Sequence, residues 1–332
     1  MIDGWYDEQN NAGVVFINIV SSIMPPEELS QEVVRDFPEG EFLFFDGIEA
    51  AGESFFSAEV FITYGEDLTE EHINKTTKLK WIMVMSAGMD EMPLKSCKEK
   101  GILITNARGI HKIPMAEFAL GTMLGHVKQK ALLMENEKAR VWNRNLPIEE
   151  LHGKTLLIIG VGAIGREIAR LAKCFGMKVA GVNRNGRENP WTDGIYPVSG
   201  LTQILPEADF IVSILPSTPE TKHLLKEEHF IAMKDSAVFM NIGRGDLVEE
   251  KVLLSALEKN QLSHAYLDVF ENEPLPEGHP FWSMENVTVT PHLSSRTKNY
   301  LPRSFEIFKH NLHTYIKNNK DYMNVIDLER GY

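Results

Sequence analysis

The sequence has few cysteines, no excess of basic residues and no long hydrophobic run. Its two cysteines, Cys97 and Cys174, lie far apart and outside any CxxC pair, so neither a disulfide framework nor a thiolate metal cluster is expected. Lysine and arginine number 34 against 47 aspartate and glutamate residues, which gives a formal net charge of -13. Binding to nucleic acid or to an anionic membrane requires a basic surface, so neither partner is expected.

The first residues of the chain and its hydrophobic content further limit the class of protein. The first ten residues, MIDGWYDEQN, are acidic and polar rather than basic and then apolar, and no apolar run is long enough to span a bilayer. We therefore expect a cytoplasmic protein with reduced thiols and no metal site. With 332 residues, of which 43% are hydrophobic, the chain is long enough for two well-filled domains.

Short apolar runs separated by helix-like segments recur along the chain. Five lie at 14–20, 41–45, 58–64, 80–85 and 102–106, and six more lie at 155–160, 178–182, 210–215, 237–242, 264–269 and 287–291. Such runs are typical of strands in a parallel sheet that helices cover on both faces. The sequence therefore predicts an α/β fold with two doubly wound parallel-sheet domains.

A helix is expected between the two series of strands. Residues 113–128, IPMAEFALGTMLGHVK, have apolar side chains on more than one face. A helix of this kind is buried on several sides. It lies either between the two domains or in a subunit interface, and periodicity alone does not decide between these interpretations.

A glycine-rich turn follows the first strand of the second series. The sequence LLIIGVGAIGREIARL runs from a predicted strand through Gly160, Gly162 and Gly165 into a predicted helix. In a dinucleotide-binding unit the first glycine permits a tight turn, the second admits the pyrophosphate and the third lets the helix pack against the strand. Because strand, helix and following strand are all expected here, we predict a dinucleotide site that also includes Ala163 and Ile164, rather than a simple turn.

The next strand ends in a basic turn, GVNRNGR. An acidic residue at this point usually binds the ribose hydroxyls, whereas an arginine accommodates a 2'-phosphate. Here Asn183 is uncharged, and Arg184 and Arg187 follow it. Two guanidinium groups can hold a dianionic phosphate, so NADP(H) is predicted in preference to NAD(H). The alternative is an Asn-Gly surface turn with two solvated arginines.

Three polar stretches follow later strand ends: MNIGRGDLVEE (240–250), LDVFENEPLP (267–276) and VTPHLSSRT (289–297). Ligands bind at this edge of open α/β sheets. Arg244 can hold the keto oxygen and carboxylate of a 2-keto acid, and His292 can donate a proton to that oxygen. Glu273, if it is hydrogen-bonded to the imidazole, would favour the charged form and fix its orientation. Each residue alone has a structural explanation, but together they predict carbonyl reduction.

These motifs carry a resemblance to a known family. GVGAIG, NIGRGDLV, LDVFENEP and TPH together resemble the D-isomer-specific 2-hydroxyacid dehydrogenases over nearly the whole chain. The basic turn and the segment LPSTPET look most like the NADPH-dependent glyoxylate and hydroxypyruvate reductases of that family. The resemblance implies that Arg244, Glu273 and His292 are catalytic and that a small 2-keto acid is reduced to the D-2-hydroxy acid.

The resemblance also implies a substrate site and further cofactor contacts. The substrate carboxylate would bind to the backbone of Ser86, Ala87 and Gly88, together with Arg244 and His292. The additional cofactor-binding residues would be Leu215, Pro216, Thr221, Ile242 and Asp268, of which the last would hold the nicotinamide carboxamide.

The resemblance further implies how the domains are arranged. A Rossmann nucleotide-binding domain, residues 104–292, would be inserted into a flavodoxin-like substrate domain made of residues 1–103 and 293–332. The last helix, about 302–318, and the tail NVIDLERGY would return to the first hundred residues. A homodimer built on the long helices of the inserted domain is implied as well, which favours the subunit interface for residues 113–128.

Two other functions are also compatible with these residues. A nucleotide-sensing regulator similar to the corepressors built on this fold would keep the same three residues but would not turn over a substrate. A related dehydrogenase that oxidises formate would not need the Glu273 and His292 pair. The residues after His292 are usually small in the family, whereas Arg296 follows here. It either faces a substrate with a second polar group or is a solvated residue.

Overall fold

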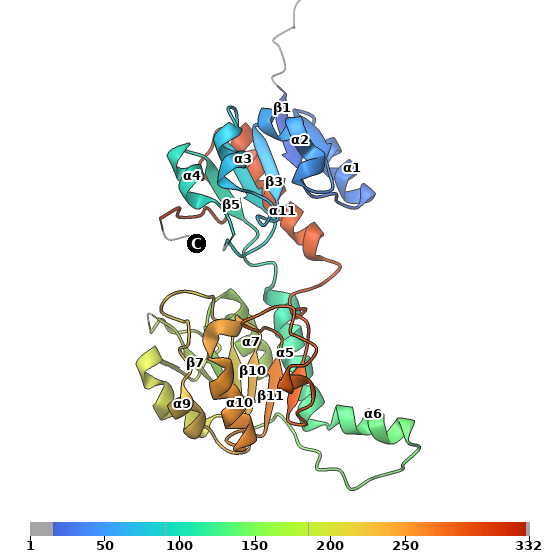
Figure 1. Cartoon of the computed structure of the whole chain (residues 1–332), viewed down its shortest axis with the longest axis vertical. Helices are drawn as coiled ribbons and strands as arrows, with labels where there is room; N and C mark the ends of the chain where they lie inside the picture. The colour runs from blue at the N-terminus through green and yellow to red at the C-terminus, as the bar shows by residue number, and fades with distance from the viewer. Residues whose placement is uncertain (1–15, 90, 185, 330–332) are drawn as a thin grey trace, which may run out of the picture. The chain divides into compact units, whose positions relative to one another are not determined.

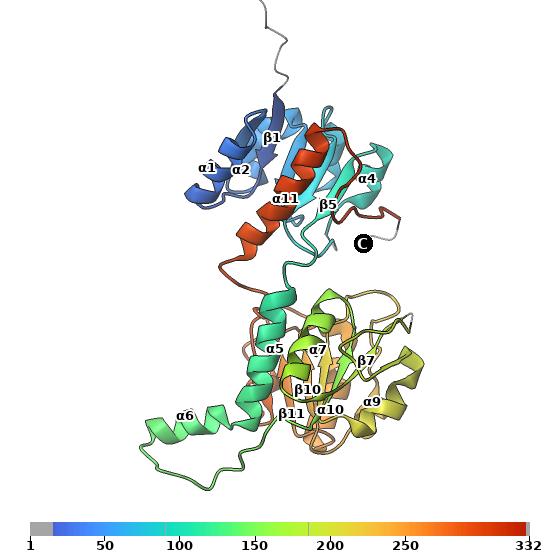
Figure 2. The ribbon, with the colours of Figure 1, turned by 180° about the vertical axis from the view of Figure 1, so that it is seen from behind.

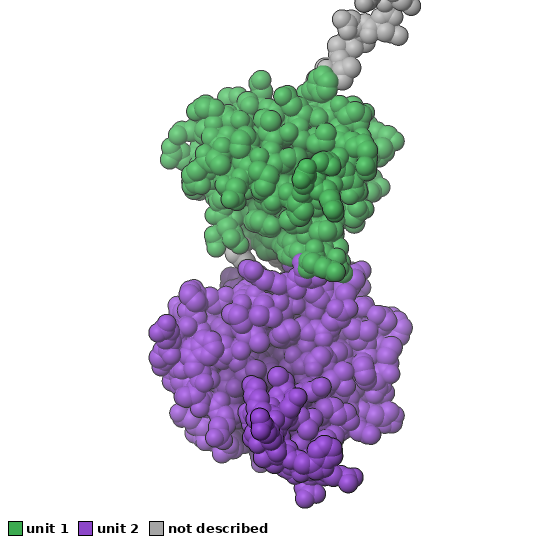
Figure 3. All heavy atoms as spheres, turned by 90° about the vertical axis from the view of Figure 1, so that its right-hand side faces the viewer, with its two compact units in different colours: residues 1–110, 298–332 green, residues 111–297 purple. Residues whose placement is uncertain are grey.

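The computed structural model describes residues 16–89, 91–184 and 186–329. The chain divides into two compact units, coloured separately in Figure 3. Unit 1 contains the chain up to Ile110 and again from Lys298, and unit 2 contains His111–Thr297. Among the described residues, no helix has the length and apolar character needed to cross a membrane.

Unit 1 contains a parallel five-stranded sheet in the order β2-β1-β3-β4-β5. The strands are β1 (Ile17–Ser21), β2 (Gly40–Phe44), β3 (Val60–Thr63), β4 (Trp81–Val84) and β5 (Leu103–Asn106), and the helices are α1 (Glu27–Asp36), α2 (Ile48–Ser57), α3 (Glu70–Lys75), α4 (Leu94–Glu99) and α11 (Tyr300–Ile316). All five predicted strands of the first series are present, although residues 14 and 15 of the first run lie outside the described residues.

The central strands of unit 1 are buried on both sides. Side chains of α2, α3 and α4 pack on one face of the sheet, and those of α1 and α11 pack on the other. Trp81 of β4 stacks on Phe308 of α11, with ring centroids 5.4 Å apart. Beyond α11 the tail reaches β5, where the Ile326 N–H donates to the Ile104 carbonyl at 2.9 Å. The predicted return of the last helix, and of the tail as far as residue 329, is therefore present, while residues 330–332 lie outside the described residues (Figures 1 and 2).

Unit 2 contains a parallel seven-stranded sheet in the order β12-β11-β10-β9-β6-β7-β8. The strands are β6 (Thr155–Ile159), β7 (Lys178–Val182), β8 (Gly194–Tyr196), β9 (Phe210–Ser213), β10 (Val238–Asn241), β11 (His264–Leu267) and β12 (Val287–Val289). Six of these were predicted, and the short edge strand β8 was not. The strand order reverses between β6 and β9, which is where ligands bind in such sheets. The predicted α/β class with two parallel-sheet domains is confirmed.

Helices cover both faces of this second sheet. The helices of unit 2 are α5 (Lys112–Val127), α6 (Lys130–Lys138), α7 (Ala163–Cys174), α8 (Leu201–Ile204), α9 (Glu227–Ile231) and α10 (Glu250–Glu258), with short 3-10 helices at Val198–Gly200, Leu205–Glu207, Gly245–Leu247 and Pro280–Trp282, and all of the α-helices except α6 pack on the sheet. Helices α5 and α7 share one core with the sheet, and α8, α9 and α10 share the other. Residues such as Ala116, Leu120 and Met123 of α5 are buried within unit 2.

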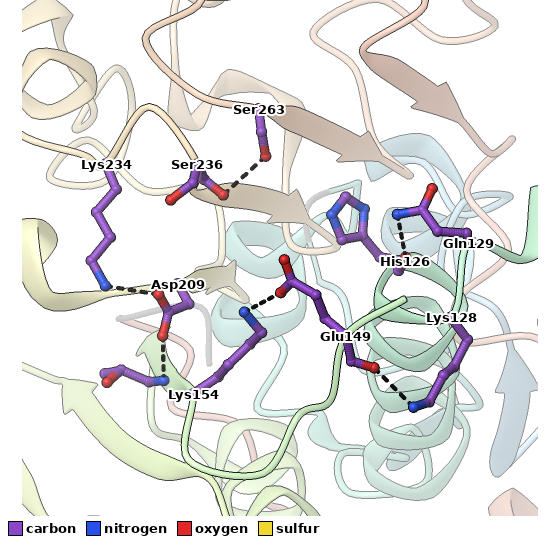
Figure 4. Close-up of polar contacts among 10 residues, drawn as sticks. His126, Lys128, Gln129, Glu149, Lys154, Asp209, Lys234, Ser236 and Ser263 are labelled. Atoms are coloured by element: carbon purple, nitrogen blue, oxygen red, sulfur yellow. Dashed lines mark hydrogen bonds and ion pairs between the residues drawn. The ribbon is translucent and has the colours of Figure 1, made fainter. Parts of the chain in front are cut away.

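A polar network ties together the edge at which these strands begin (Figure 4). The Asp209 carboxylate accepts the Thr155 N–H at 2.8 Å and the Lys234 ammonium at 2.7 Å. Lys154 forms an ion pair with Glu149 at 2.5 Å. These contacts hold the amino edge of the sheet, whereas ligands bind to sheets of this type at the opposite, carboxyl edge.

Helix α6 and the segment after it form an arm, defined here as residues 128–149, that projects from the end of α5 (Figure 1). Its base is closed because the Glu149 N–H donates to the Val127 carbonyl at 2.8 Å. No residue of α6 is buried. The arm exposes six large apolar side chains: Leu132, Leu133, Met134, Val141, Trp142 and Ile148. Trp142 is 92% exposed, an unusual state for a tryptophan in a folded protein.

Candidate active site

The glycine-rich turn has the geometry that a pyrophosphate site requires. Gly160 has a φ of +111°, which permits the tight turn out of β6. A Cβ on Gly165 would lie 2.4 Å from the Gly160 carbonyl oxygen, so only glycine lets α7 approach the strand so closely. A Cβ on Gly162 would meet nothing within 4 Å, and no side chain caps the start of α7 among the described residues. The start of α7 therefore has open space beside Gly162 and N–H groups without a side-chain cap, which are the features that an anion site at a helix start requires.

The basic turn after β7 is exposed. The Asn183 side chain donates to the Arg187 carbonyl oxygen at 3.0 Å, and both arginines of the turn are exposed. Residue 185 lies outside the described residues. The pKa of Glu220 lies below its ordinary value, first because the Thr218 side chain donates to it and also because the Arg184 charge is near. The turn is thus close to the loop that follows β9.

That loop after β9 closes on itself and contacts the next strand end. The Thr221 hydroxyl donates to the Pro216 carbonyl at 2.6 Å and accepts the Thr218 N–H at 2.9 Å. The Ser217 hydroxyl donates to the Asp246 carboxylate at 2.6 Å. The predicted cofactor segment is therefore joined directly to the turn that carries Arg244.

Arg244 follows β10 between two glycines that have no room for a side chain. A Cβ on Gly243 would lie 2.7 Å from the Leu215 carbonyl oxygen. A Cβ on Gly245 would lie 1.9 Å from the carbonyl carbon of Phe270. The Arg244 turn is thus pressed between the segments that follow β9 and β11, which places the arginine at the carboxyl edge of the sheet.

The conformation of the Arg244 turn is fixed by Asn241, the last residue of β10. Its buried side-chain oxygen accepts the Gly243 N–H at 3.2 Å, and its side-chain nitrogen donates to the Arg244 carbonyl at 2.9 Å. His111, at the start of α5, also lies near this arginine. Burial lowers the pKa of His111 to about 4, and the Arg244 charge lowers it as well. His111 is therefore uncharged at neutral pH.

His292 and Glu273 are paired as the sequence predicted. The imidazole Nδ1 lies 2.8 Å from Glu273 Oε2, and Glu273 Oε1 accepts the Phe270 N–H at 2.9 Å. The His292 side chain is 45% exposed. Within the described part of the chain, no hydrogen bond uses its Nε2. Because Glu273 occupies Nδ1, Nε2 is the nitrogen that can meet a ligand.

Asp268, which follows β11, is almost fully buried, with 1% of its surface exposed. Its carboxylate accepts the Thr290 hydroxyl at 2.5 Å and the N–H groups of Leu293 and Ser294 at 3.0 and 2.9 Å. The residue predicted to hold the nicotinamide carboxamide is therefore also bonded to the loop that carries His292. These contacts were not predicted from the sequence.

The other predicted cofactor residues lie at the same edge of unit 2. Ala163 and Ile164 form the first turn of α7, and Leu215 follows β9. Ile242, directly after β10, is buried, so its side chain belongs to the core. Arg296 is exposed, and its N–H donates to the Leu293 carbonyl at 2.9 Å. Whether this arginine faces a substrate stays a prediction.

The predicted carboxylate site, residues 86–88, belongs to unit 1 and follows β4. The Ser86 hydroxyl lies within hydrogen-bond distance of the Tyr64 and Gly88 carbonyl oxygens, at 3.2 and 3.1 Å. Among the described residues, no hydrogen bond uses the N–H groups of Ser86, Ala87 or Gly88. The backbone N–H groups of this short segment can therefore donate hydrogen bonds to an anion. No group of three or more metal-ligating side chains was found in the described ranges.

The fold and the strand-end residues define a class, the dinucleotide-binding oxidoreductases of Rossmann type. The D-isomer specific 2-hydroxyacid dehydrogenase NAD-binding domain model matches residues 120–294, more than half of the chain. The chain belongs to the D-isomer specific 2-hydroxyacid dehydrogenase family, as its motifs predicted.

Relatives within the family differ in the substrates that their names state. D-3-phosphoglycerate dehydrogenase of Methanocaldococcus jannaschii is 35% identical over 70% of this chain, but the match spans only 45% of that longer protein. Glyoxylate/hydroxypyruvate reductase B of Escherichia fergusonii is 33% identical over 75% of this chain and 79% of its own length. The crystal structure of an NADPH-dependent glyoxylate/hydroxypyruvate reductase from Sinorhizobium meliloti, in complex with NADP and sulfate, superposes with a TM-score of 0.80. It is 26% identical, over 95% of this chain and all of that chain.

Proposed function

We propose that this protein reduces a small 2-keto acid, of the glyoxylate or hydroxypyruvate type, to the D-2-hydroxy acid. The observation that carries the proposal is the 2.8 Å contact between His292 Nδ1, which follows β12, and Glu273 Oε2, which follows β11, the neighbour of the strand that precedes Arg244. A histidine held in this way by one nitrogen can deliver a proton from the other. The similarity to glyoxylate/hydroxypyruvate reductase B supports this substrate class.

Each side chain has one task in this mechanism. The planar guanidinium of Arg244 binds the keto oxygen and the adjacent carboxylate of the substrate. His292 gives the Nε2 proton to that oxygen, and Glu273 keeps the ring oriented through Nδ1. A bound nicotinamide cofactor supplies the hydride. We assign the backbone donors of residues 86–88 to the substrate carboxylate, so unit 1 is the substrate domain and unit 2 the cofactor domain.

The preferred cofactor in this proposal is NADPH. The open space at Gly162 suits a pyrophosphate, which both nicotinamide dinucleotides carry. Arg184 and Arg187 are exposed side chains beside Asn183, at the point where a carboxylate would repel a 2'-phosphate. The structure of the Sinorhizobium meliloti reductase, which is a complex with NADP, supports the same preference.

We further propose that the protein is a homodimer in which the arm packs against a second copy. The support is the set of six exposed apolar side chains that the arm carries, with Trp142 at 92% exposure. Exposed apolar clusters of this kind mark protein contacts. The arm continues directly from α5, the helix for which the sequence left a subunit interface open.

The test is a panel of 2-keto acids that includes glyoxylate, hydroxypyruvate, pyruvate and 3-phosphohydroxypyruvate, assayed with NADPH and with NADH. The parent should reduce the first two fastest. His292→Gln should lower kcat by roughly 10²–10⁴-fold, with little change in the Kd for NADPH. His313→Gln, at an exposed position of α11, is the matched control and should behave as the parent does.

Three results would contradict the proposal. Fastest reduction of 3-phosphohydroxypyruvate would move the substrate class toward that named for the Methanocaldococcus jannaschii relative. Near-normal turnover by His292→Gln would remove the proton donor. Binding of NADPH without reduction of any acid would instead support a nucleotide-sensing regulator.

A further inference from the structure

The loop that carries His292 is fastened to one buried carboxylate. Asp268 Oδ1 accepts the Thr290 hydroxyl at 2.5 Å and the Leu293 N–H at 3.0 Å. Its Oδ2 accepts the Ser294 N–H at 2.9 Å. The donors come from both sides of His292, so the carboxylate closes residues 290–294 into a fixed turn.

The backbone of Asp268 adds a further contact to this turn. Its carbonyl oxygen accepts the His292 N–H at 2.8 Å, and its own N–H donates to Asn241 at the end of the neighbouring strand. His292 itself has a φ of +48°, in the left-handed region that few residues other than glycine adopt. A backbone in this region persists where its surroundings hold it. The contacts with Asp268 supply that support.

We propose that Asp268 is a positioning residue, which fixes the 290–294 turn so that the His292 imidazole meets Glu273 and presents Nε2 at the sheet edge. This inference rests on the proposed function, in which His292 gives the proton. It differs from the cofactor contact that the family resemblance implies, because Asp268 acts here through another side chain. A reaction of this kind loses rate steeply when a reacting group is displaced by an ångström.

The chemistry of the three donors explains why an aspartate is needed. A carboxylate only accepts hydrogen bonds, and all three of its partners here are donors. Asp268→Asn keeps the shape but places an NH₂ group against at least one N–H or hydroxyl donor. Thr290→Val removes one donor and leaves the carboxylate, and Thr290→Ser restores the hydroxyl. These variants therefore weaken the turn in graded steps.

Asp209→Asn is the matched control. Asp209 also accepts a backbone N–H and a side-chain donor, but at the amino edge of the same sheet. The same chemical change there should lower stability without altering the His292 turn. Melting temperatures of all four variants separate a loss of fold from a loss of position.

Two measurements test the proposal. Hydrogen exchange followed by mass spectrometry should show the amides of Leu293 and Ser294 exchanging about tenfold faster or more in Asp268→Asn, and at the parental rate in Asp209→Asn. Steady-state assays with glyoxylate should show kcat reduced by roughly 10–100-fold in Asp268→Asn, with the Kd for NADPH within about threefold of the parent. The kcat of Thr290→Val should lie between that of the parent and that of Asp268→Asn. The kcat of Thr290→Ser should lie within about twofold of the parent value.

The contradicting results appear in different measurements. Unchanged exchange at Leu293 and Ser294 in Asp268→Asn, or parental kcat despite faster exchange, would overturn the positioning role. A raised Kd for NADPH with unaltered kcat would assign the carboxylate to the cofactor instead. A parent that binds NADPH but reduces none of the 2-keto acids would contradict the proposed function, and the exchange data would still decide whether Asp268 holds the turn.

Discussion

A charge change at the turn after β7 should reverse the preference between the two nicotinamide cofactors. The perturbation is Asn183→Asp combined with Arg184→Ala. It removes a guanidinium that can bind the 2'-phosphate and adds a carboxylate that repels it and can bind the ribose hydroxyls. The pyrophosphate proposed to bind at Gly162 is common to both cofactors, so its binding should not change.

The exposure of the turn determines how large the change in cofactor preference should be. Charge-assisted hydrogen bonds contribute about 1.5–3 kcal/mol, but Arg184 is exposed, and exposure reduces this contribution. Two altered contacts at about 1–1.5 kcal/mol each sum to about 2–3 kcal/mol, which corresponds to a roughly 30- to 150-fold change in the ratio of kcat/KM for NADPH to that for NADH. The nearby carboxylate of Glu220 adds to the repulsion once Arg184 is removed.

The assay compares kcat/KM for NADPH and NADH at low and high salt with one 2-keto acid. The loss for NADPH should shrink as salt rises, because salt screens charges at an exposed site. Arg170→Ala is the matched control: it also removes one cation from unit 2, but Arg170 lies near the end of α7, where it forms an ion pair with Glu167. A double variant that prefers NADPH as strongly as the parent, or a parent that prefers NADH, would refute the reasoning.

Three further expectations concern packing, assembly and pH. Gly245→Ala should lower the free energy of unfolding by about 1–3 kcal/mol and also lower kcat/KM, because its Cβ would overlap the Phe270 carbonyl carbon. Gly278→Ala is the control: a Cβ there meets nothing within 4 Å, so melting temperature and activity should not change. Trp142→Ser should weaken dimers in sedimentation experiments while Trp191→Ser, outside the arm, should not; equal dimerisation of both would remove the arm from the interface. Burial lowers the pKa of His264 to about 4, so the unfolded chain binds a proton near pH 6.5 that the folded chain does not, and stability should be full well above pH 6.5 and fall by roughly 3 kcal/mol toward pH 4. Urea unfolding at several pH values should show a shallower fall for His264→Gln, and parallel curves would contradict this assignment.

The strands and the glycine-rich turn were predictable because each depends on residues close together in the sequence. A run such as residues 155–160 is apolar on both faces, and a strand buried on both faces requires that pattern. Strand β8 has only three residues, all partly buried, so its hydrophobic signal is too short to recognise. A hydrogen bond between His292 and Glu273 could be predicted, since both residues follow strands of one sheet. The distance between their side chains could not be predicted without the fold.

Contacts that depend on the approach of separate strand ends could not be predicted. Gly243 and Gly245 look like ordinary turn glycines in the sequence, yet they are required because the segments after β9 and β11 press against the Arg244 turn. Similarly, Ser217 and Asp246 are 29 residues apart, and nothing in the local pattern marks them as partners. Such positions are recognised only when the packing of the three strand ends is known.

The two strands beside the proposed reaction centre share one structural arrangement. Each places a buried polar residue at its end: Asn241 after the apolar part of β10 and Asp268 directly after β11. Each of these residues fixes the turn that presents a proposed catalytic side chain, Arg244 in one case and His292 in the other. A buried polar side chain without a partner would lower the stability of the fold. The side chains of Asn241 and Asp268 are instead hydrogen-bonded to the turns beside them. Because the backbone of Asp268 also donates to Asn241, the two turns are joined through the ends of neighbouring strands. A displacement of either turn therefore acts on the other, and variants of Asn241 and Asp268 should be non-additive in kcat.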